Sequence, residues 1–251
     1  MNKTAFIAGA TGFTGREVVR LLCEMGVETV AHIRPDSSRF DQWMDQFQSQ
    51  GAVVDNTPWA LDAIANTLRQ RAPDDVFFLI GTTRARDRQS EDDNSYRAVD
   101  YGLFRLLLDA CIQGEISPTI LYLSAMGTGP NPRTAYYRAR WDCEKDLRAC
   151  GLSYRIARPG IITGPGREDP RPMERLGGAL ADGLAASLRL VGARRLADRY
   201  GSITNTELAR ALVQLALDDN SPPVVESEEL QALARRHLDF ADDETTSVPS
   251  S

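Results

Sequence analysis

Apolar runs alternate with amphipathic stretches from residue 3 to about residue 160. The runs have the length of buried strands, and the stretches between them have the spacing of helices that cover a sheet. This alternation predicts parallel strands joined by right-handed crossovers, and therefore an α/β fold with a doubly wound parallel sheet. The predicted strands are 3–8, 28–33, 51–55, 75–80, 118–124 and 152–158, and the predicted helices are 14–25, 39–49, 59–71, 92–113 and 134–150.

The pattern changes after residue 164. Residues 164–202 are rich first in Gly, Pro and charge and then in small residues, so we expect a substrate-side insert over the edge of the sheet. Beyond it the pattern predicts a helix over 205–217 capped by Thr204 or Asn205, a short strand at Val224 and Val225, and a helix near 227–238.

Length and composition limit the class of protein. With 251 residues and no Pro/Gly/Ser-rich linker, the chain fits a single domain over 1–240, and the acidic tail 241–251 predicts disorder. A net charge of −6 argues against a nucleic-acid binder, and no run is long enough to span a membrane. The start of the chain lacks the apolar core of a signal peptide, so we expect a cytoplasmic protein. We also expect a small-molecule substrate and a monomer or homodimer. Four scattered cysteines and two distant histidines predict reduced thiols and no metal site.

The segment KTAFIAGATGFTG, residues 3–15, carries the most informative motif. Gly9 allows a sharp turn out of the first strand, Gly12 allows a pyrophosphate to approach the backbone, and Gly15 allows the following helix to pack closely. The start of that helix favours phosphate through its free N–H groups and dipole. The spacing is G-x-x-G-x-x-G rather than G-x-G-x-x-G, and a purely structural turn is the alternative. We predict a dinucleotide site lined by Gly9, Thr11, Gly12, Phe13, Thr14 and Gly15.

The end of the second strand bears on the choice of coenzyme. A chain that selects NAD places Asp or Glu there to bind the ribose 2′-hydroxyl. This chain has Arg34, 19 residues after Gly15, with Arg39 nearby and Arg16 just past the glycine turn. Guanidinium groups suit a 2′-phosphate, so we predict NADP, while Asp36 keeps NAD open.

Two further strand ends carry candidate coenzyme contacts. Asp55 ends the third strand, where it could meet the adenine amino group. Gly81, Thr82 and Thr83 end the fourth, where small side chains let a ribose pass over the backbone. Both groups are also ordinary turn residues, which is the alternative interpretation.

Candidate catalytic residues follow the fifth strand. Ser124 ends that strand, and Tyr136 and Arg140 stand four apart on the predicted helix, on one face. A cation beside a phenol lowers the pKa of the phenol from about 10, as a general acid/base for a carbonyl or alcohol requires. Tyr137 lacks a cationic partner and is interpreted as packing. Lys145 lies about 13 Å from Tyr136 along the helix axis, too far to substitute for Arg140.

The motif GATGFTG, Ser124, the Tyr-x-x-x-basic helix and RIARPGIITGPG together resemble an atypical short-chain dehydrogenase/reductase. The segments GTTRARDRQ, YRAVDYG, LSAMG, YYRARWDCE and RPG look like its Tat-interacting oxidoreductase-like branch. NmrA-like and epimerase relatives share the opening motif. The resemblance covers residues 3–165 well and the remainder loosely.

The resemblance implies an NADP(H)-binding Rossmann fold with a Ser/Tyr/Lys catalytic group. Ser124 would position the substrate, Tyr136 would act as general acid/base, and Pro159 and Gly160 would border the nicotinamide. The lysine of the family falls on Arg140, which keeps a fixed charge but cannot give up a proton.

The sequence therefore predicts an NADP(H)-dependent oxidoreductase that transfers hydride to or from a small carbonyl or alcohol. The alternative is a catalytically weak, NADP(H)-dependent regulatory or scaffold protein, which the arginine substitution favours. A third interpretation, a nucleotide-sugar epimerase or dehydratase, fits RPGIITGPG but leaves only about 85 residues after Gly164 for a substrate domain.

Overall fold

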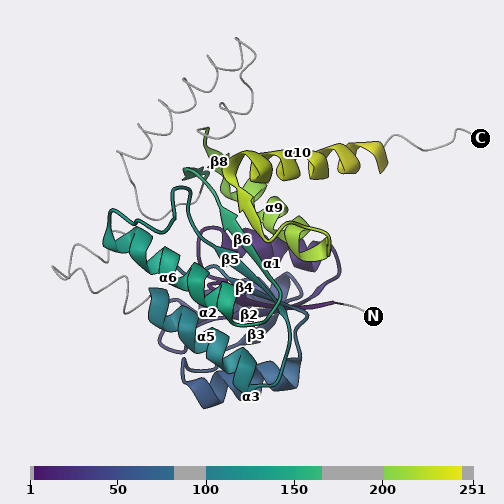
Figure 1. The fold of residues 1–251 in the computed structure, drawn as a ribbon. Helices are drawn as coiled ribbons and strands as arrows, with labels where there is room; N and C mark the ends of the chain where they lie inside the picture. The colour runs from purple at the N-terminus through teal and green to yellow at the C-terminus, as the bar shows by residue number, and fades with distance from the viewer. Residues whose placement is uncertain (1–2, 82–99, 166–200, 245–251) are drawn as a thin grey trace, which may run out of the picture.

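A computed structural model describes residues 3–81, 100–165 and 201–244, with side chains described up to residue 236. Its main sheet has seven strands, and every neighbouring pair is parallel. In spatial order the strands are β3 (Val53–Asp55), β2 (Glu28–His32), β1 (Thr4–Ala8), β4 (Asp75–Phe78), β5 (Thr119–Leu123), β6 (Tyr154–Arg158) and β9 (Val224–Glu226). The doubly wound α/β fold is thereby confirmed (Figure 1).

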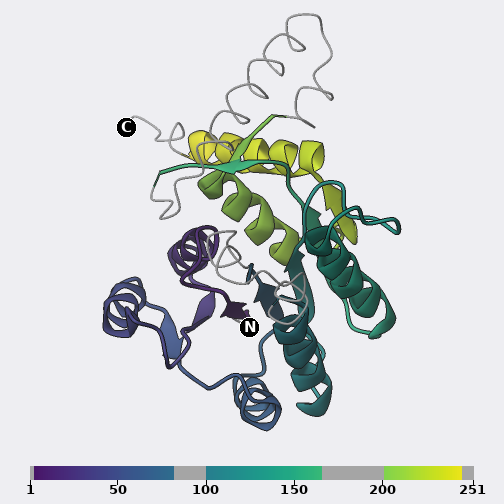
Figure 2. The same ribbon diagram turned by 90° about the vertical axis from the view of Figure 1, so that its left-hand side faces the viewer.

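Helices cover both faces of the sheet (Figures 1 and 2). One face carries α3 (Leu61–Arg71), α5 (Gly102–Gln113) and α6 (Ala135–Ala149). The other carries α1 (Gly15–Glu24), α2 (Phe40–Ser49), α9 (Asn205–Leu217) and α10 (Ser227–Glu244). The three-layer arrangement leaves the carboxyl ends of the strands as the edge where a ligand can approach.

The strand sequences explain why the sheet is buried on both sides. In β1, Ala5 and Ile7 pack into the core under α1 and α9, while Phe6 and Ala8 pack into the core under α3 and α5. All four are 1% exposed or less. Successive side chains of a strand point to opposite faces, so a continuous apolar run fills two cores at once.

The strand order reverses between β1 and β4. From β1 the chain builds outward to β2 and β3, and then returns to β4 on the other side of β1. The crevice at the carboxyl ends of β1 and β4 is therefore the topological switch point, where ligands of such sheets bind. The loop from Gly9 to Gly15, called the glycine turn below, lies directly after β1.

Several predicted boundaries differ from the structure. The first six strands of the sheet are shorter than predicted by one or two residues, and β9 is one residue longer. The helix α5 begins at Gly102, with 92–99 outside the described residues. A second parallel pair, β7 (Ile162–Thr163) with β8 (Ile203–Thr204), was not predicted, because two residues are too short for a recognisable pattern. Most of the predicted insert, 166–200, also lies outside the described residues.

The C-terminal helices follow the predicted order. Thr204 caps α9 in a reciprocal pair with Glu207, which decides between the two predicted caps. The helix α10 runs to Glu244 and so includes the first residues of the predicted tail; 245–251 lie outside the described residues. Among the described residues, no helix is both long enough and apolar enough to cross a membrane.

Candidate functional site

The glycine turn lies directly against the backbone that follows β4, at the topological switch point. Gly9 has φ +91°, a conformation that costs glycine little, and its carbonyl accepts a hydrogen bond from the N–H of Gly12 at 2.9 Å. A Cβ on Gly9 would lie 2.8 Å from the carbonyl carbon of Leu79, which follows β4. A side chain at this position would force β1 and β4 apart.

The same turn leaves the start of α1 open. A Cβ on Gly15 would overlap the carbonyl oxygen of Gly9, so the helix can begin this close only with glycine. Thr14 is the N-cap residue, and its side chain makes no capping bond. The first N–H groups of a helix have no intrahelical partners and attract anions. A backbone cradle that a Cβ would fill, at an uncapped helix start, fits the diphosphate of a dinucleotide.

Arginines gather beyond the end of β2. The guanidinium carbon of Arg39 lies 4.9 Å from the centre of the Trp43 ring, and that of Arg16 lies 5.4 Å from the same ring. Trp43 is only 3% exposed and comes from α2. Arg34 forms an ion pair with Asp36 at 3.5 Å. The indole therefore holds two cations from two different elements beside the glycine turn.

Asp55 lies buried at the end of β3, with its carboxylate bound locally. Its two oxygens accept hydrogen bonds from the hydroxyl and the N–H of Thr57, at 2.8 and 3.2 Å. His32 lies 3.9 Å away and donates from Nε2 to the Thr57 carbonyl, and burial lowers the pKa of His32. The structure thus shows an Asp-stabilised turn; a contact with adenine stays a prediction.

Arg140 occupies the carboxyl edge between β4 and β5. It is buried on α6, and its Nη1 donates to the carbonyl of Leu123 at 2.8 Å and to the hydroxyl of Tyr122 at 3.3 Å. Its Nη2 pairs with Asp100 at 3.4 Å and would lie 3.0 Å from a Cβ on Gly81. Burial acts against the charge, but the neighbouring phenol and carboxylate groups outweigh it and raise the pKa of Arg140 well above its usual value. The guanidinium is therefore a permanent cation.

Tyr136 lies beside this cation, half-buried in the first turn of α6. The guanidinium carbon of Arg140 lies 5.3 Å from the centre of its ring. The one-turn spacing thus brings the predicted pair together. The Tyr137 ring instead packs on that of Tyr136 and beside Gly127, and Lys145 pairs with Asp142 on the surface.

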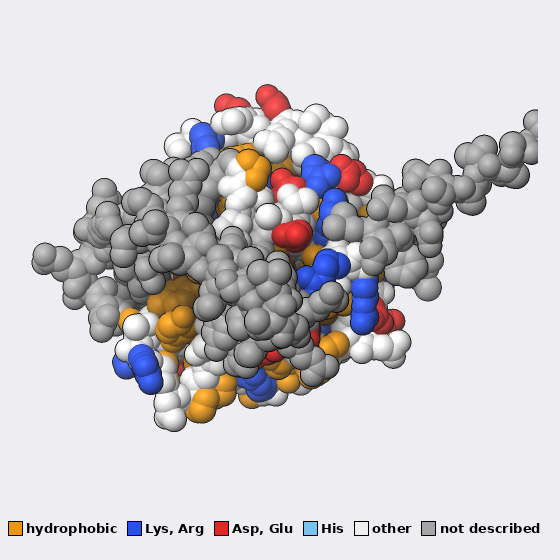
Figure 3. Space-filling model, turned by 90° about the horizontal axis from the view of Figure 1, so that it is seen from above, with side chains coloured by type: hydrophobic (Ala, Val, Ile, Leu, Met, Phe, Trp, Pro, Cys, Tyr) orange, Lys and Arg blue, Asp and Glu red, His pale blue; other side chains and the backbone are white. Residues whose placement is uncertain are grey.

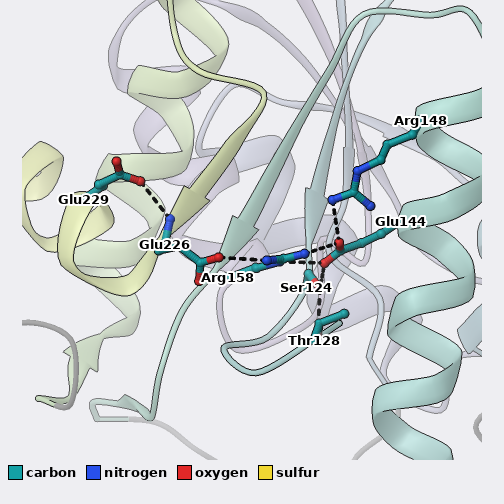
Figure 4. A network of polar contacts seen from close by, with 7 residues as sticks. All are labelled: Ser124, Thr128, Glu144, Arg148, Arg158, Glu226 and Glu229. Carbon is teal, nitrogen blue, oxygen red and sulfur yellow. Dashed lines mark hydrogen bonds and ion pairs between the residues drawn. The ribbon is translucent and has the colours of Figure 1, made fainter. Parts of the chain in front are cut away.

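Ser124 does not join this pair through any described contact. It is 4% exposed, and its hydroxyl donates to Glu144 at 2.7 Å, with Thr128 at 3.3 Å (Figure 4). A hydroxyl has one proton to donate, so the proton that would orient a substrate oxygen is bound elsewhere. The predicted substrate contact of Ser124 stays a prediction, while in this structure its hydroxyl donates to Glu144. The strand end turns this side chain toward α6 rather than outward.

Glu144 organises a network that the sequence reasoning missed. This fully buried carboxylate also accepts hydrogen bonds from Arg158 and Arg148, and Arg158 reaches Glu226 at 2.8 Å (Figure 4). Hydrogen bonds to the two glutamates raise the pKa of Arg158. The network ties α6, β5, β6 and β9 together. Glu144 lies one turn after Arg140, so its face was predictable, but its partners were not.

Pro159 and Gly160 continue from β6 along the same edge. The carbonyl of Pro159 accepts a hydrogen bond from the N–H of Met126 at 2.9 Å, and the N–H of Gly160 donates to Ser227 at 3.3 Å. These bonds fix the segment against the β5 end and the start of α10. Their contact with a nicotinamide stays a prediction. Thr82 and Thr83, also predicted to bind coenzyme, lie outside the described residues.

The face of the molecule seen in Figure 3 carries charges of both signs among its described residues. Seen from above, basic and acidic side chains of the described residues lie side by side, with hydrophobic side chains toward the lower edge (Figure 3). Within the described ranges, no three His, Cys, Asp or Glu side chains lie together in a way that could hold a metal ion.

Comparisons with known proteins place the chain in a family. A family model described as NAD(P)H-binding matches residues 9–219. Protein fmp52-1, mitochondrial, from Aspergillus oryzae is 30% identical over 178 residues, which is 69% of this chain and 71% of that protein. Protein fmp52, mitochondrial, from Aspergillus clavatus is 30% identical over 174 residues, or 67% and 70%.

Solved structures share the fold. UDP-glucose 4-epimerase from Brucella ovis in complex with NAD has a TM-score of 0.62 at 20% identity, covering 92% of this chain and 81% of that one. UDP-N-acetylglucosamine 4-epimerase from Bacillus cereus has a TM-score of 0.63 at 17% identity, covering 92% and 84%. At these identities the likeness shows the Rossmann fold alone. Together with the glycine turn at the switch point, the family match shows that the chain belongs to the NAD(P)H-binding family and is an atypical short-chain dehydrogenase/reductase in fold and motifs.

Proposed function

We propose that this protein is an NADP(H)-dependent oxidoreductase acting on a small carbonyl or alcohol. The observation that carries the proposal is the Arg140 guanidinium 5.3 Å from the Tyr136 ring, at the same sheet edge as the glycine turn. A bound nicotinamide would supply the hydride. The chain itself would bind the coenzyme, hold the substrate oxygen and move a proton to or from it.

The arginines beyond β2 support NADP over NAD. Arg16 and Arg39 are held against Trp43, and Arg34 neutralises Asp36, the carboxylate that would otherwise favour NAD. A 2′-phosphate would gain charge-assisted hydrogen bonds from such guanidinium groups. NAD would gain no comparable contact with them.

Tyr136 would exchange its phenolic proton with the substrate oxygen. The Arg140 cation would stabilise negative charge on that phenol while the proton is away. Because Arg140 stays protonated, it takes no part in relaying the proton. Its Nε–H, which has no partner among the described residues, would donate a hydrogen bond to a coenzyme hydroxyl. Ser124 enters as an anchor of the β5 end through Glu144 rather than as a substrate ligand.

The remaining predicted contacts would complete the proposed coenzyme site. Asp55 would meet the adenine end, and Gly81 would leave room for a ribose beside Arg140. Pro159 and Gly160 would border the nicotinamide. We keep the cytoplasm as the proposed location; the fungal relatives are named mitochondrial, and fractionation of cells decides between the two.

A second candidate is an NADP(H)-binding regulatory protein with weak catalysis. The binding of the Ser124 proton by Glu144 and the arginine in place of lysine favour it. It predicts tight coenzyme binding without turnover over a broad panel of carbonyls. An epimerase or dehydratase remains a third candidate, since the solved structures that share the fold of this chain include epimerases.

The test combines coenzyme binding with a Tyr136→Phe variant. Calorimetry with NADPH and NADH on the purified protein should show binding, tighter for NADPH; binding of neither would overturn the proposal. Tyr136→Phe should bind NADPH as the wild type does and lose about 100- to 10,000-fold in turnover on a substrate found by screening. Tyr137→Phe is the matched control and should keep its rate. Full turnover by Tyr136→Phe would exclude its role as acid/base.

A further inference from the structure

Asn205 joins the glycine turn to the start of α9, which lies on the same face of the sheet as α1. It is the first residue of α9, only 5% exposed, and its Nδ2 donates to the carbonyl of Phe13 at 3.3 Å. The two residues are 192 positions apart in the sequence. A carbonyl oxygen can only accept, so the nitrogen of the amide must face it.

The Phe13 carbonyl belongs to the peptide that leads into Thr14. In a trans peptide the C=O and the following N–H point in opposite directions. When Asn205 holds the carbonyl on one side, the N–H of Thr14 is directed to the other. Thr14 is the N-cap of α1, so its N–H is among those that a helix offers to an anion.

Gly164 makes this contact possible. A Cβ on Gly164, which has φ +135°, would overlap Oδ1 of Asn205 and lie 3.3 Å from the ring of Phe13. That Oδ1 is buried and has no hydrogen-bond partner among the described residues. The end of β7, the start of α9 and the glycine turn therefore meet at one point, with the Asn205 amide between them.

We propose that Asn205 is a positioning residue for the coenzyme diphosphate, acting through the Phe13–Thr14 peptide. The inference rests on the coenzyme binding assigned to the glycine turn in the proposed function. Asn205 itself does not touch the coenzyme; it fixes the direction of one N–H donor. Gly164 supports it by leaving space for the amide.

The experiment measures coenzyme affinity in Asn205→Ala. Loss of one hydrogen bond that orients a donor should weaken NADPH binding about five- to tenfold. Binding of adenosine 2′-monophosphate, which lacks the diphosphate, should be unchanged. In the protein without coenzyme, hydrogen exchange at the N–H groups of Gly12 and Arg16, which are bonded within the turn, should speed up.

Two controls isolate the contact. Gln214→Ala removes another amide from α9, one whose Oε1 is likewise buried without a partner among the described residues, and should leave NADPH binding unchanged. If Asn205→Ala fails to fold, Gly164→Ala displaces the same amide and should weaken NADPH in the same way. Its control is Gly51→Ala, another positive-φ glycine, with open space around it.

The outcomes separate this inference from the proposed function. Asn205→Ala or Gly164→Ala with wild-type NADPH affinity and unchanged exchange at the turn would overturn the positioning role while leaving the oxidoreductase intact. Equal weakening of adenosine 2′-monophosphate would also overturn it. If the wild type binds no nicotinamide coenzyme, the proposed function fails, and the exchange rates at Gly12 and Arg16 alone decide whether Asn205 positions the turn.

Discussion

The two ends of the predicted coenzyme site are built in different ways. At the glycine turn, contacts between backbone atoms determine the shape of the site, because Cβ atoms on Gly9 and Gly15 would collide with the main chain. At the α6 end, side chains determine the shape of the site, through Arg140 and through Ser124, which donates to Glu144. A backbone site leaves few alternatives to the residue present. A side-chain site depends on the contacts that each side chain makes, and here Arg140 stands where the family resemblance implies a lysine.

The largest expected effect on coenzyme binding comes from Gly15→Ala. Its Cβ would overlap the Gly9 carbonyl, so the turn must open and the diphosphate loses hydrogen bonds to the helix start. We expect NADPH affinity to fall roughly 100-fold, the value of one or two hydrogen bonds to a charged group, measured by calorimetry. Gly129→Ala, where nothing lies within 4 Å of the new Cβ, is the control and should bind as the wild type does. Unchanged binding by Gly15→Ala would remove the contrast between the two ends.

Glu144→Ala tests the side-chain end. The variant removes the buried carboxylate to which Ser124 and Arg158 donate, so the free energy of unfolding should fall by about 3 kcal/mol, measured by denaturant titration. Lys145→Ala changes an exposed neighbour on the same helix and should stay within about 0.5 kcal/mol. A loss below about 1 kcal/mol would mean that the network does not hold this end together.

Arg140→Lys restores the residue of the family and sharpens the comparison. An ammonium cannot reach the Leu123 carbonyl, the Tyr122 hydroxyl and Asp100 in the geometry of the guanidinium, so we expect a loss of about 2 kcal/mol in unfolding free energy. The exposed Arg138→Lys is the control and should cost nearly nothing. A free energy of unfolding equal to that of the wild type would show that lysine can replace Arg140 without loss of stabilising contacts.

Asp75→Asn provides a reference away from both ends. Burial raises the pKa of Asp75 to about 6, against the opposing charge of Lys3 at 3.8 Å. The folded protein therefore holds this proton more tightly than the unfolded chain, and this group adds stability as pH falls from about 7 toward 4. At pH 7 the variant should be more stable by about 1–3 kcal/mol, and the gain should vanish near pH 4.

The pH dependence is read as the difference between the Asp75→Asn variant and the wild type in thermal or denaturant unfolding. Asp219→Asn, an exposed partner of the same lysine, should show little difference at any pH. A difference that grows toward acid pH would contradict the assignment to Asp75. In that case the pH dependence would belong to groups nearer the site.

The sequence by itself determined the order along the chain of the main-sheet strands and their helices, and the glycine turn. These follow from local patterns: apolar runs that fill two cores, and glycines where the backbone admits no Cβ. The pairing of Tyr136 with Arg140 also followed, because one helical turn places them together.

Only the tertiary structure decided which partner each polar side chain meets. Ser124 was predicted to face a substrate but lies against Glu144, 20 residues away, and Asn205 was considered only as a cap but reaches Phe13 across 192 residues. No local pattern encodes such contacts, because the direction of a side chain at a strand or helix end depends on what packs beside it. The physical reason is that a polar group leaves water only where a distant part of the chain supplies its hydrogen bond.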